Sequence, residues 1–206
     1  MRGLEIKDKI LSKLIDLPTL PEVVNKVMEI ANNPRSSAAD MAKVISQDQA
    51  LTARILKLVN SAYYGFPRRI STIAQAIVIL GFRTVRDLVL NISILDMFNS
   101  KKQAGINIEA LWLHNLAVAV TSKVLAKRMG YDQPDEAFTA GLLHDIGKLA
   151  MIKLFPQEYE KIVNIAQGSS RWIRDVEESF LEVDHALIGK WIADHWKFPP
   201  QLTRAI

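Results

Sequence analysis

Apolar residues recur at intervals of three and four positions along almost the whole chain, and this spacing restricts the fold more than any other feature. After Asp48, for example, Leu51, Ile55, Leu58 and Val59 lie on one stripe, which is the pattern of an amphipathic helix that packs on a core. No stretch shows the alternation of apolar and polar residues that is typical of a half-buried strand. We therefore predict an all-α fold, arranged as a helical bundle.

Capping and turn residues divide this pattern into separate helices. Asp48 and Ser71 each precede an apolar stripe, and their side chains are of the kind that caps a helix N-terminus, so we expect helices to begin there. Gly81 predicts the end of the second of these helices. Residues 99–105 are polar and interrupt the pattern, so we expect the main internal boundary there.

The second half is expected to open with a long helix over about residues 108–129. Pro134 and Pro156 predict two further helix starts, because a first helical residue needs no partner for its backbone N–H. Asp184 is expected to cap the helix that contains His185. A last helix is expected to have barely begun where the sequence stops.

Composition limits the available chemistry. A chain of 206 residues, 49% hydrophobic and 23% charged, can bury a substantial core without a covalent or metal staple. It has no cysteine, which excludes disulfides, thiolate catalysis and cysteine-ligated metals. Any metal ion must therefore be held by histidine and carboxylate side chains.

Charge and hydropathy limit the partners. The sequence starts without a secretory signal, and no apolar run approaches the roughly 20 residues that span a bilayer, so we expect a cytoplasmic protein with no membrane partner. The net charge is +4, and the basic clusters Pro67-Arg68-Arg69 and Lys101-Lys102 are small. Nucleic-acid-binding proteins usually concentrate positive charge on one face, so we do not expect a nucleic-acid partner.

The adjacent His144 and Asp145 are the polar pair hardest to explain as part of a core. His144 shares a helical face with the small residues Ala137, Ala140 and Gly141, and Asp145 continues an adjoining apolar stripe. A buried carboxylate beside an imidazole is costly unless something compensates its charge. A divalent cation such as Fe, Mn, Zn or Mg would do so, and we therefore predict part of a metal site here.

Further histidines and a lysine are candidates for the same site. His114 is expected to face the core, and His185 could be a third imidazole, whereas His195 lies at the edge of an apolar face. Lys148 lies one turn after His144, where a phosphate oxygen could sit. The alternative for each histidine is a core residue bonded to a backbone carbonyl. That alternative is preferred for His185 and His195, and both interpretations stand equally for His114.

The segment from Gly141 to Lys148, with the sequence GLLHDIGK, resembles the central motif of the HD superfamily of metal-dependent phosphohydrolases, which includes the HD-GYP cyclic-di-GMP phosphodiesterases. Residues 17–21, 48–52, 60–64 and 76–81 resemble motifs of the HDOD family of bacterial HD-related output domains. Residues 112–114 and 184–199 fit the same family in order. The resemblance runs from about Leu17 to Ile206.

The resemblance implies a single domain over residues 1–206. Its N-terminal helical part, about 1–100, would pack on an HD-like part, about 106–206, that is truncated at its C-terminus. His114, His144 and Asp145 match the first three metal ligands of the HD pattern. The chain departs from the family at Gln49, where proline is common, and from the HD-GYP enzymes in lacking their paired histidines and Gly-Tyr-Pro segment.

The last aspartate of the HD pattern is not identified. Asp184 is better explained as a helix cap, and Asp194 is expected to face solvent beside Lys190. Either the missing ligand lies beyond Ile206 or the site is incomplete.

The family resemblance and the incomplete ligand set together lead to the first hypothesis, a bacterial signalling module that acts through a protein partner without catalysis. Its partner surface is expected to include the aromatic residues Tyr63 and Tyr64. The alternative is a metal-dependent phosphohydrolase acting on a nucleotide or cyclic dinucleotide, with one or two cations at the predicted metal site and Lys148 near the phosphate. A third hypothesis is a sensor that binds a nucleotide or metal without hydrolysis. Salt-dependent binding would be needed to support a nucleic-acid role.

Overall fold

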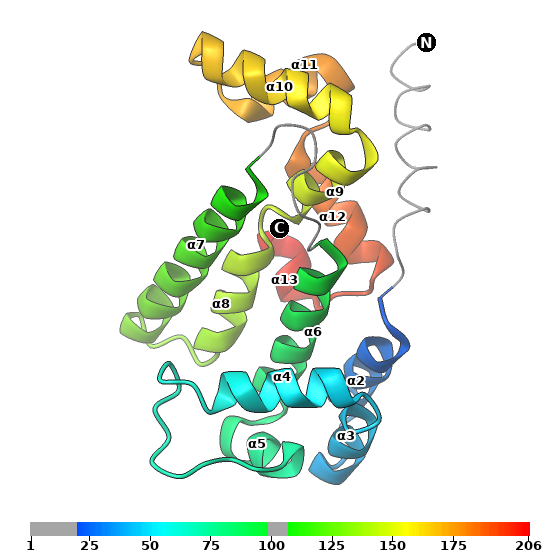
Figure 1. Ribbon diagram of the computed structural model, residues 1–206, viewed down its shortest axis with the longest axis vertical. Helices are drawn as coiled ribbons and strands as arrows, with labels where there is room; N and C mark the ends of the chain where they lie inside the picture. Colours follow the sequence, from blue (N-terminus) through cyan, green and yellow to red (C-terminus); the bar gives the residue numbers. More distant parts are fainter. Residues whose placement is uncertain (1–19, 99–106) are drawn as a thin grey trace. The chain divides into compact units, whose positions relative to one another are not determined.

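The computed structural model describes residues 20–98 and 107–206, and these residues form helices without any strand, as the periodicity predicts (Figure 1). They fall into two compact units, an N-terminal unit of residues 20–98 and a C-terminal unit of residues 107–206. The predicted boundary at 99–105 and the motif residues 17–19 lie outside the described residues. The single-domain organisation stays a prediction. Within the described ranges, no helix combines the length and the hydropathy needed to span a bilayer.

The N-terminal unit is built around its longest helix. Its helices are α2 (Glu22–Asn32), α3 (Ala38–Ile45), α4 (Gln49–Val59), α5 (Ile73–Leu80) and α6 (Phe82–Phe98). Helix α6 packs against α2, α4 and α5, and α3 packs against α2 and α5. Aliphatic side chains from successive helices, such as Val27, Ile45, Ile55 and Val89, are completely buried and form the core. The predicted amphipathic stripes therefore face inward.

Most predicted helix ends in this unit are confirmed, and one is displaced by a residue. The Asp48 side chain accepts a hydrogen bond from the backbone N–H of Leu51 at 3.0 Å, as expected of an N-cap. The prediction that Ser71 caps the next helix is wrong, because Thr72 is the N-cap and accepts from the backbone N–H of Gln75. Ser71 instead donates from its backbone N–H and its hydroxyl to Oε1 of Gln75, at 3.0 and 3.1 Å.

The C-terminal unit contains two closely packed helix pairs, and the pairs are joined where one helix ends and the next begins, at His144 and Asp145. Its helices are α7 (Ile108–Arg128), α8 (Pro134–Leu143), α9 (Ile146–Leu154), α10 (Pro156–Ser169), α11 (Ile173–Leu181), α12 (His185–His195) and α13 (Pro200–Ala205). Helix α7 packs along α8, and α12 packs along α9. Helix α10 packs against α9 and α11, while α13 packs against α8 and α12. The predicted starts at Pro134 and Pro156 are confirmed.

Two glycines allow these helix pairs to approach closely. A Cβ atom at Gly141 of α8 would lie 2.8 Å from the Cα atom of Ala119 on α7. A Cβ atom at Gly147 of α9 would lie only 1.8 Å from the carbonyl oxygen of His185 on α12. Real Cβ atoms do not make such contacts, so both positions require glycine. The two approaches bring α7 and α12 to the junction of α8 and α9, where His144 and Asp145 lie.

Candidate metal centre

Asp145 lies at the centre of a cluster of nitrogen atoms. Its side chain is only 2% exposed. One carboxylate oxygen, Oδ2, lies 3.5 Å from Nε2 of His144 and 3.7 Å from Nε2 of His114. The other oxygen, Oδ1, lies 3.5 Å from Nε2 of His185. The fold thus brings three imidazoles from α7, α12 and the α8–α9 junction to one buried carboxylate.

His114, His144 and Asp145 are spaced like ligands of one metal ion. Each offers a ligand atom, and the three atoms lie within 4.8 Å of one another. Ligand atoms bound tetrahedrally at about 2.1 Å from a zinc ion would lie about 3.4 Å apart, close to the separations between Asp145 and the two histidines. Nitrogen and carboxylate oxygen donors suit zinc, iron and manganese. These three residues could therefore hold a divalent cation.

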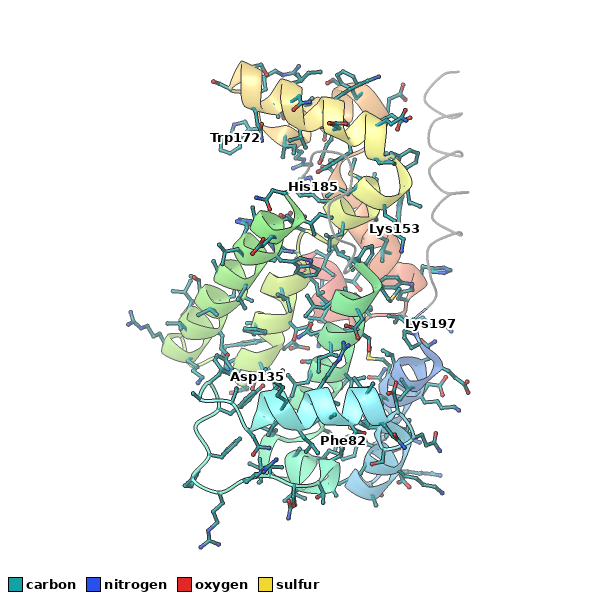
Figure 2. The ribbon with its side chains drawn as sticks, in the orientation of Figure 1. Phe82, Asp135, Lys153, Trp172, His185 and Lys197 are labelled. Carbon is teal, nitrogen blue, oxygen red and sulfur yellow. The ribbon has the colours of Figure 1, made fainter. Side chains whose placement is uncertain are left out.

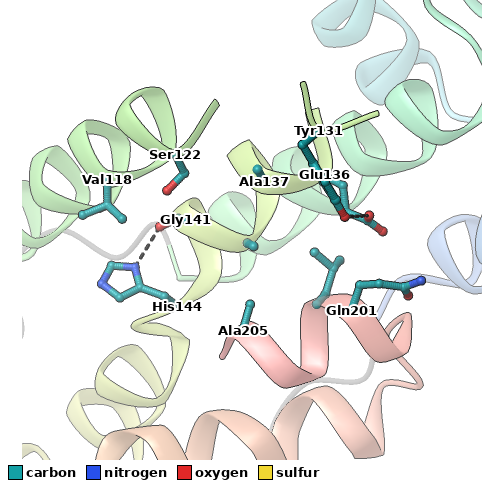
Figure 3. Close-up of a pocket in the computed structure, with 11 residues that line it drawn as sticks. Val118, Ser122, Tyr131, Glu136, Ala137, Gly141, His144, Gln201 and Ala205 are labelled. Atoms are coloured by element: carbon teal, nitrogen blue, oxygen red, sulfur yellow. Dashed lines mark hydrogen bonds between the residues drawn. The ribbon is translucent and has the colours of Figure 1, made fainter. Parts of the chain in front are cut away.

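The backbone orients one of these imidazoles. Nδ1 of His144 lies 2.8 Å from the carbonyl oxygen of Gly141, one turn earlier (Figure 3). Because a carbonyl oxygen only accepts hydrogen bonds, Nδ1 carries a proton, and in the neutral ring Nε2 keeps its lone pair. That lone pair faces a carboxylate oxygen, an arrangement that a cation between the two acceptors would stabilise. Metal-binding histidines are commonly held in this way by a backbone carbonyl.

The expectation that His114 faces the core is wrong. Its side chain is 54% exposed, and the buried face of α7 instead runs through Asn115, Ala119 and Ala126. Adjacent residues on a helix point about 100° apart, so His114 lies at the edge of this face. From there it still approaches Asp145, and its ring centroid is 5.3 Å from that of His144. The His114 side of the cluster is consequently open to solvent.

Lys148 contacts the carboxylate itself. Its Nζ atom lies 2.7 Å from Oδ2 of Asp145, the oxygen that also faces His114 and His144. The sequence places Lys148 near a phosphate, whereas in the structure its ammonium group compensates the negative charge of Asp145 from one turn further along α9. The Asp145 carboxylate is therefore charge-compensated by the chain's own residues.

His185 approaches the carboxylate from the other side. It is the first residue of α12 (Figure 2), and its side chain is 16% exposed. Its second ring nitrogen contacts Glu177, a completely buried residue of α11. Sequence reasoning missed Glu177, although its position four residues after Ile173 and four before Leu181 placed a charge on an apolar stripe.

The remaining acidic candidates are engaged elsewhere. The Asp184 side chain caps α12 by accepting from the backbone N–H of Leu187 at 2.7 Å, which confirms its predicted role. Its other oxygen contacts Arg174 at 2.5 Å. Asp194 is exposed and lies 3.9 Å from Lys190, as expected. Neither aspartate belongs to the cluster around Asp145.

A cavity of about 410 Å³ adjoins the cluster (Figure 3). Its walls come from α7, α8 and α13, and His144 lies at one end of it. Ala137, Ala140 and Gly141, which the sequence suggests as small residues beside His144, also line it. A small molecule in this cavity could contact the His144 ring.

The aromatic residues of the N-terminal unit form a separate cluster in the segment after α4. The rings of Tyr63 and Tyr64 meet edge to face with centroids 5.1 Å apart, and Tyr64 stacks on Phe66 at 6.0 Å. Tyr63 is 51% exposed. The surface role that sequence analysis predicts for Tyr63 and Tyr64 stays a prediction.

Known proteins resemble the chain over most of its length. The family model described as the HDOD domain matches residues 17–206. A solved candidate phosphohydrolase from Shewanella amazonensis SB2B is 33% identical, with a TM-score of 0.78 over 95% of this chain and 69% of that one. An HDOD domain protein of unknown function from Geobacter sulfurreducens is 30% identical, with a TM-score of 0.82 over 98% of this chain and 68% of that one.

A longer protein also matches. An uncharacterized protein from Treponema pallidum (strain Nichols) is 27% identical over 199 residues, which are 96% of this chain and 38% of that protein. The chain thus spans less than half the length of this curated relative.

Proposed function

The chain belongs to the HDOD family, and from that premise we propose that it is a regulatory module of bacterial signal transduction that binds a divalent cation and acts through a protein partner. The observation that carries the proposal is the cluster of His114, His144 and Asp145, whose ligand atoms lie within 4.8 Å of one another. A bound cation would neutralise Asp145 and link α7 to the α8–α9 junction. Occupancy could thereby favour one packing of these helices over another.

The contact between Lys148 and Asp145 supports reversible cation binding. At 2.7 Å, the ammonium group already compensates the oxygen that faces both histidines. The cluster is therefore charge-compensated without a cation, and an arriving ion must share Oδ2 with the ammonium group or displace it, which suits reversible binding. A cytoplasmic location stays a prediction.

Cation binding can be tested directly on the purified chain. Elemental analysis after equilibration with Mn²⁺, Fe²⁺ or Zn²⁺ should find about one ion per chain. The double variant His144→Ala/Asp145→Asn should lose it, whereas His195→Ala, an exposed histidine outside the cluster, should keep it. Equal metal content in all three proteins would overturn the cation site.

The partner surface needs a separate test. A photo-crosslinking amino acid at Tyr63 should capture a discrete partner in cells, and the same group at the exposed Glu29 of α2 should not. In a cation-gated module, His144→Ala/Asp145→Asn should alter the yield at position 63. Capture that is identical at both positions would contradict a partner surface at the aromatic cluster.

Metal-dependent phosphohydrolysis is the second candidate, favoured by the openness of the cluster. Three protein ligands with a free coordination position are typical of catalytic rather than structural metal sites, and His114 is 54% exposed. In such a reaction the cation would supply Lewis-acid polarisation of a phosphoryl oxygen. His114, His144 and Asp145 would hold it, and the Lys148 ammonium would lie beside the phosphate oxygens. The 33%-identical Shewanella protein is named as a candidate phosphohydrolase.

Turnover assays separate the two candidates. Metal-loaded protein would be incubated with phosphomonoesters, nucleotides and cyclic dinucleotides. Product that disappears in Asp145→Asn would establish hydrolysis. Thermal shifts with a nucleotide but without product would instead favour a ligand sensor, and absence of both would leave the cation-binding regulatory module.

A further inference from the structure

Glu177 of α11 is a buried carboxylate whose two oxygens both have hydrogen-bond partners. It is 0% exposed and accepts three hydrogen bonds. The Tyr159 hydroxyl donates to Oε1 at 2.8 Å. The backbone N–H of His185 donates to Oε2 at 2.9 Å, and Nδ1 of the same residue lies 2.5 Å from that oxygen. Such a set of donors is what an ionised buried carboxylate needs.

These contacts determine how the His185 ring is turned. A carboxylate has no proton to donate, so at this contact Nδ1 of His185 is the donor and carries the proton. Nε2 is then directed away from Glu177, and it lies 3.5 Å from Oδ1 of Asp145. Glu177 therefore presents the second imidazole nitrogen to the carboxylate of the cluster.

Tyr159 holds Glu177 in this position. The phenol is 1% exposed, and burial, followed by the charge of Glu177, raises the pKa of Tyr159 well above its ordinary value. The hydroxyl consequently stays a hydrogen-bond donor at neutral pH. Residues from α10, α11 and α12 thus form one chain of contacts, Tyr159–Glu177–His185, that ends at Asp145.

We propose that Glu177, held by Tyr159, is a positioning residue that makes His185 part of the cation site. It does so by directing Nε2 of His185 toward Oδ1 of Asp145, whereas His114 and His144 face Oδ2. The inference rests on the proposed cation site. Carboxylate partners of this kind fix the tautomer of a metal-site histidine and raise its basicity, and their loss typically costs about 10- to 100-fold in metal affinity.

The competing explanation is a purely structural clamp. Glu177 also ties the start of α12 to α11 through the backbone N–H of His185. In that case its removal would lower the stability of the fold without changing cation affinity in the molecules that remain folded. The test must therefore measure affinity and stability separately.

The decisive measurement is Co²⁺ affinity, followed by visible absorbance of the whole chain, with Tm recorded on each protein. Glu177→Gln should weaken Co²⁺ binding by about 10- to 100-fold. Tyr159 and His185 donate to different oxygens of Glu177, and glutamine replaces one of these acceptors with an NH2 donor. The matched control is Glu178→Gln, the same change at the next residue, whose side chain is 53% exposed; it should bind like the wild type. If Glu177→Gln is not folded, Tyr159→Phe tests the same chain of contacts and should weaken binding by a smaller factor.

A double-mutant cycle shows whether Glu177 acts through His185. In a His185→Ala background, Glu177→Gln should cause little further loss of Co²⁺ affinity. Full additivity of the two effects would overturn the proposal. So would wild-type affinity in Glu177→Gln with a lowered Tm, which is the signature of the structural clamp.

An NMR measurement without metal separates this inference from the proposed function. Nitrogen-15 spectra of the metal-free protein should show the His185 proton on Nδ1 in the wild type. In Glu177→Gln a larger fraction of the molecules should carry the proton on Nε2. If the wild type binds no Co²⁺ but shows this proton, the cation site fails and the positioning role of Glu177 stands. An unprotonated Nδ1 in the wild type would overturn the positioning role.

Discussion

The Oδ2 atom of Asp145 faces three cationic or cation-binding groups, and Lys148 is the nearest at 2.7 Å. A metal ion bound by His114, His144 and Asp145 would share this oxygen with the ammonium group. Because like charges in a partly buried site repel one another, Lys148→Met should tighten Co²⁺ binding, by about tenfold, which is about 1.4 kcal/mol. It should also lower the stability of the metal-free protein, since Asp145 loses its compensating charge.

The measurement is a Co²⁺ titration beside urea unfolding of the metal-free protein. Lys161→Met, at an exposed position of α10, controls for the loss of one positive charge. Weaker Co²⁺ binding in Lys148→Met would show that the ammonium group supports the site instead of competing with the ion.

Tyr159 makes the stability of the folded protein depend on pH in the alkaline range. Its pKa is raised by burial and by Glu177, so above about pH 10 the unfolded chain loses the phenol proton while the folded chain keeps it. The folded state then binds more protons, and stability must fall as pH rises, by up to about 1.4 kcal/mol per pH unit. Tyr159→Phe lacks the titrating group, and its unfolding free energy should fall less steeply between pH 9 and 11 in urea titrations. Equal slopes would contradict this assignment.

At the scale of helices, the site depends on how closely α9 and α12 pack. The carbonyl oxygen of His185 occupies the space of a Cβ atom at Gly147, so Gly147→Ala forces two backbones apart. We expect a loss of about 1–3 kcal/mol in unfolding free energy and weaker Co²⁺ binding, because His185 moves with α12. Gly168→Ala in α10 is the matched control, since its Cβ atom would meet nothing within 4 Å. That change should stabilise the chain by about 0.5–1 kcal/mol.

Urea unfolding of the two variants checks this contrast. Opposite signs for Gly147→Ala and Gly168→Ala are expected. A Gly147→Ala protein as stable as the wild type would show that α9 and α12 can separate at little cost.

The contacts between helices are also what the sequence does not predict. Periodicity and capping residues predict the all-helical class and several helix starts, because both are local properties. Asp145 is identified as a polar residue on an apolar stripe. The inward orientation predicted for His114 is wrong because the sequence does not fix the position of a buried helix face to better than one residue. One residue corresponds to about 100° of rotation around the helix axis. Glu177 was missed because its partners, Tyr159 and His185, are 18 and 8 residues away in sequence. Only the packing of α10, α11 and α12 brings them together.

At the scale of the whole molecule, every residue proposed to contact the cation belongs to the C-terminal unit. A ligand that binds only the folded state stabilises it by mass action, by about 2.7 kcal/mol at a concentration 100 times its Kd. That gain should appear first in the helices that the cation links, α7, α8 and α9, and in α12 through His185.

Hydrogen exchange followed by mass spectrometry can resolve this distribution in the intact chain. Saturating Co²⁺ should slow amide exchange most in residues 107–154 and 185–195, and least in residues 20–98, because local opening in the C-terminal unit must release the ion whereas opening in the N-terminal unit need not. His144→Ala/Asp145→Asn should show no change with Co²⁺. Equal protection of both units would contradict a cation effect centred on the C-terminal unit.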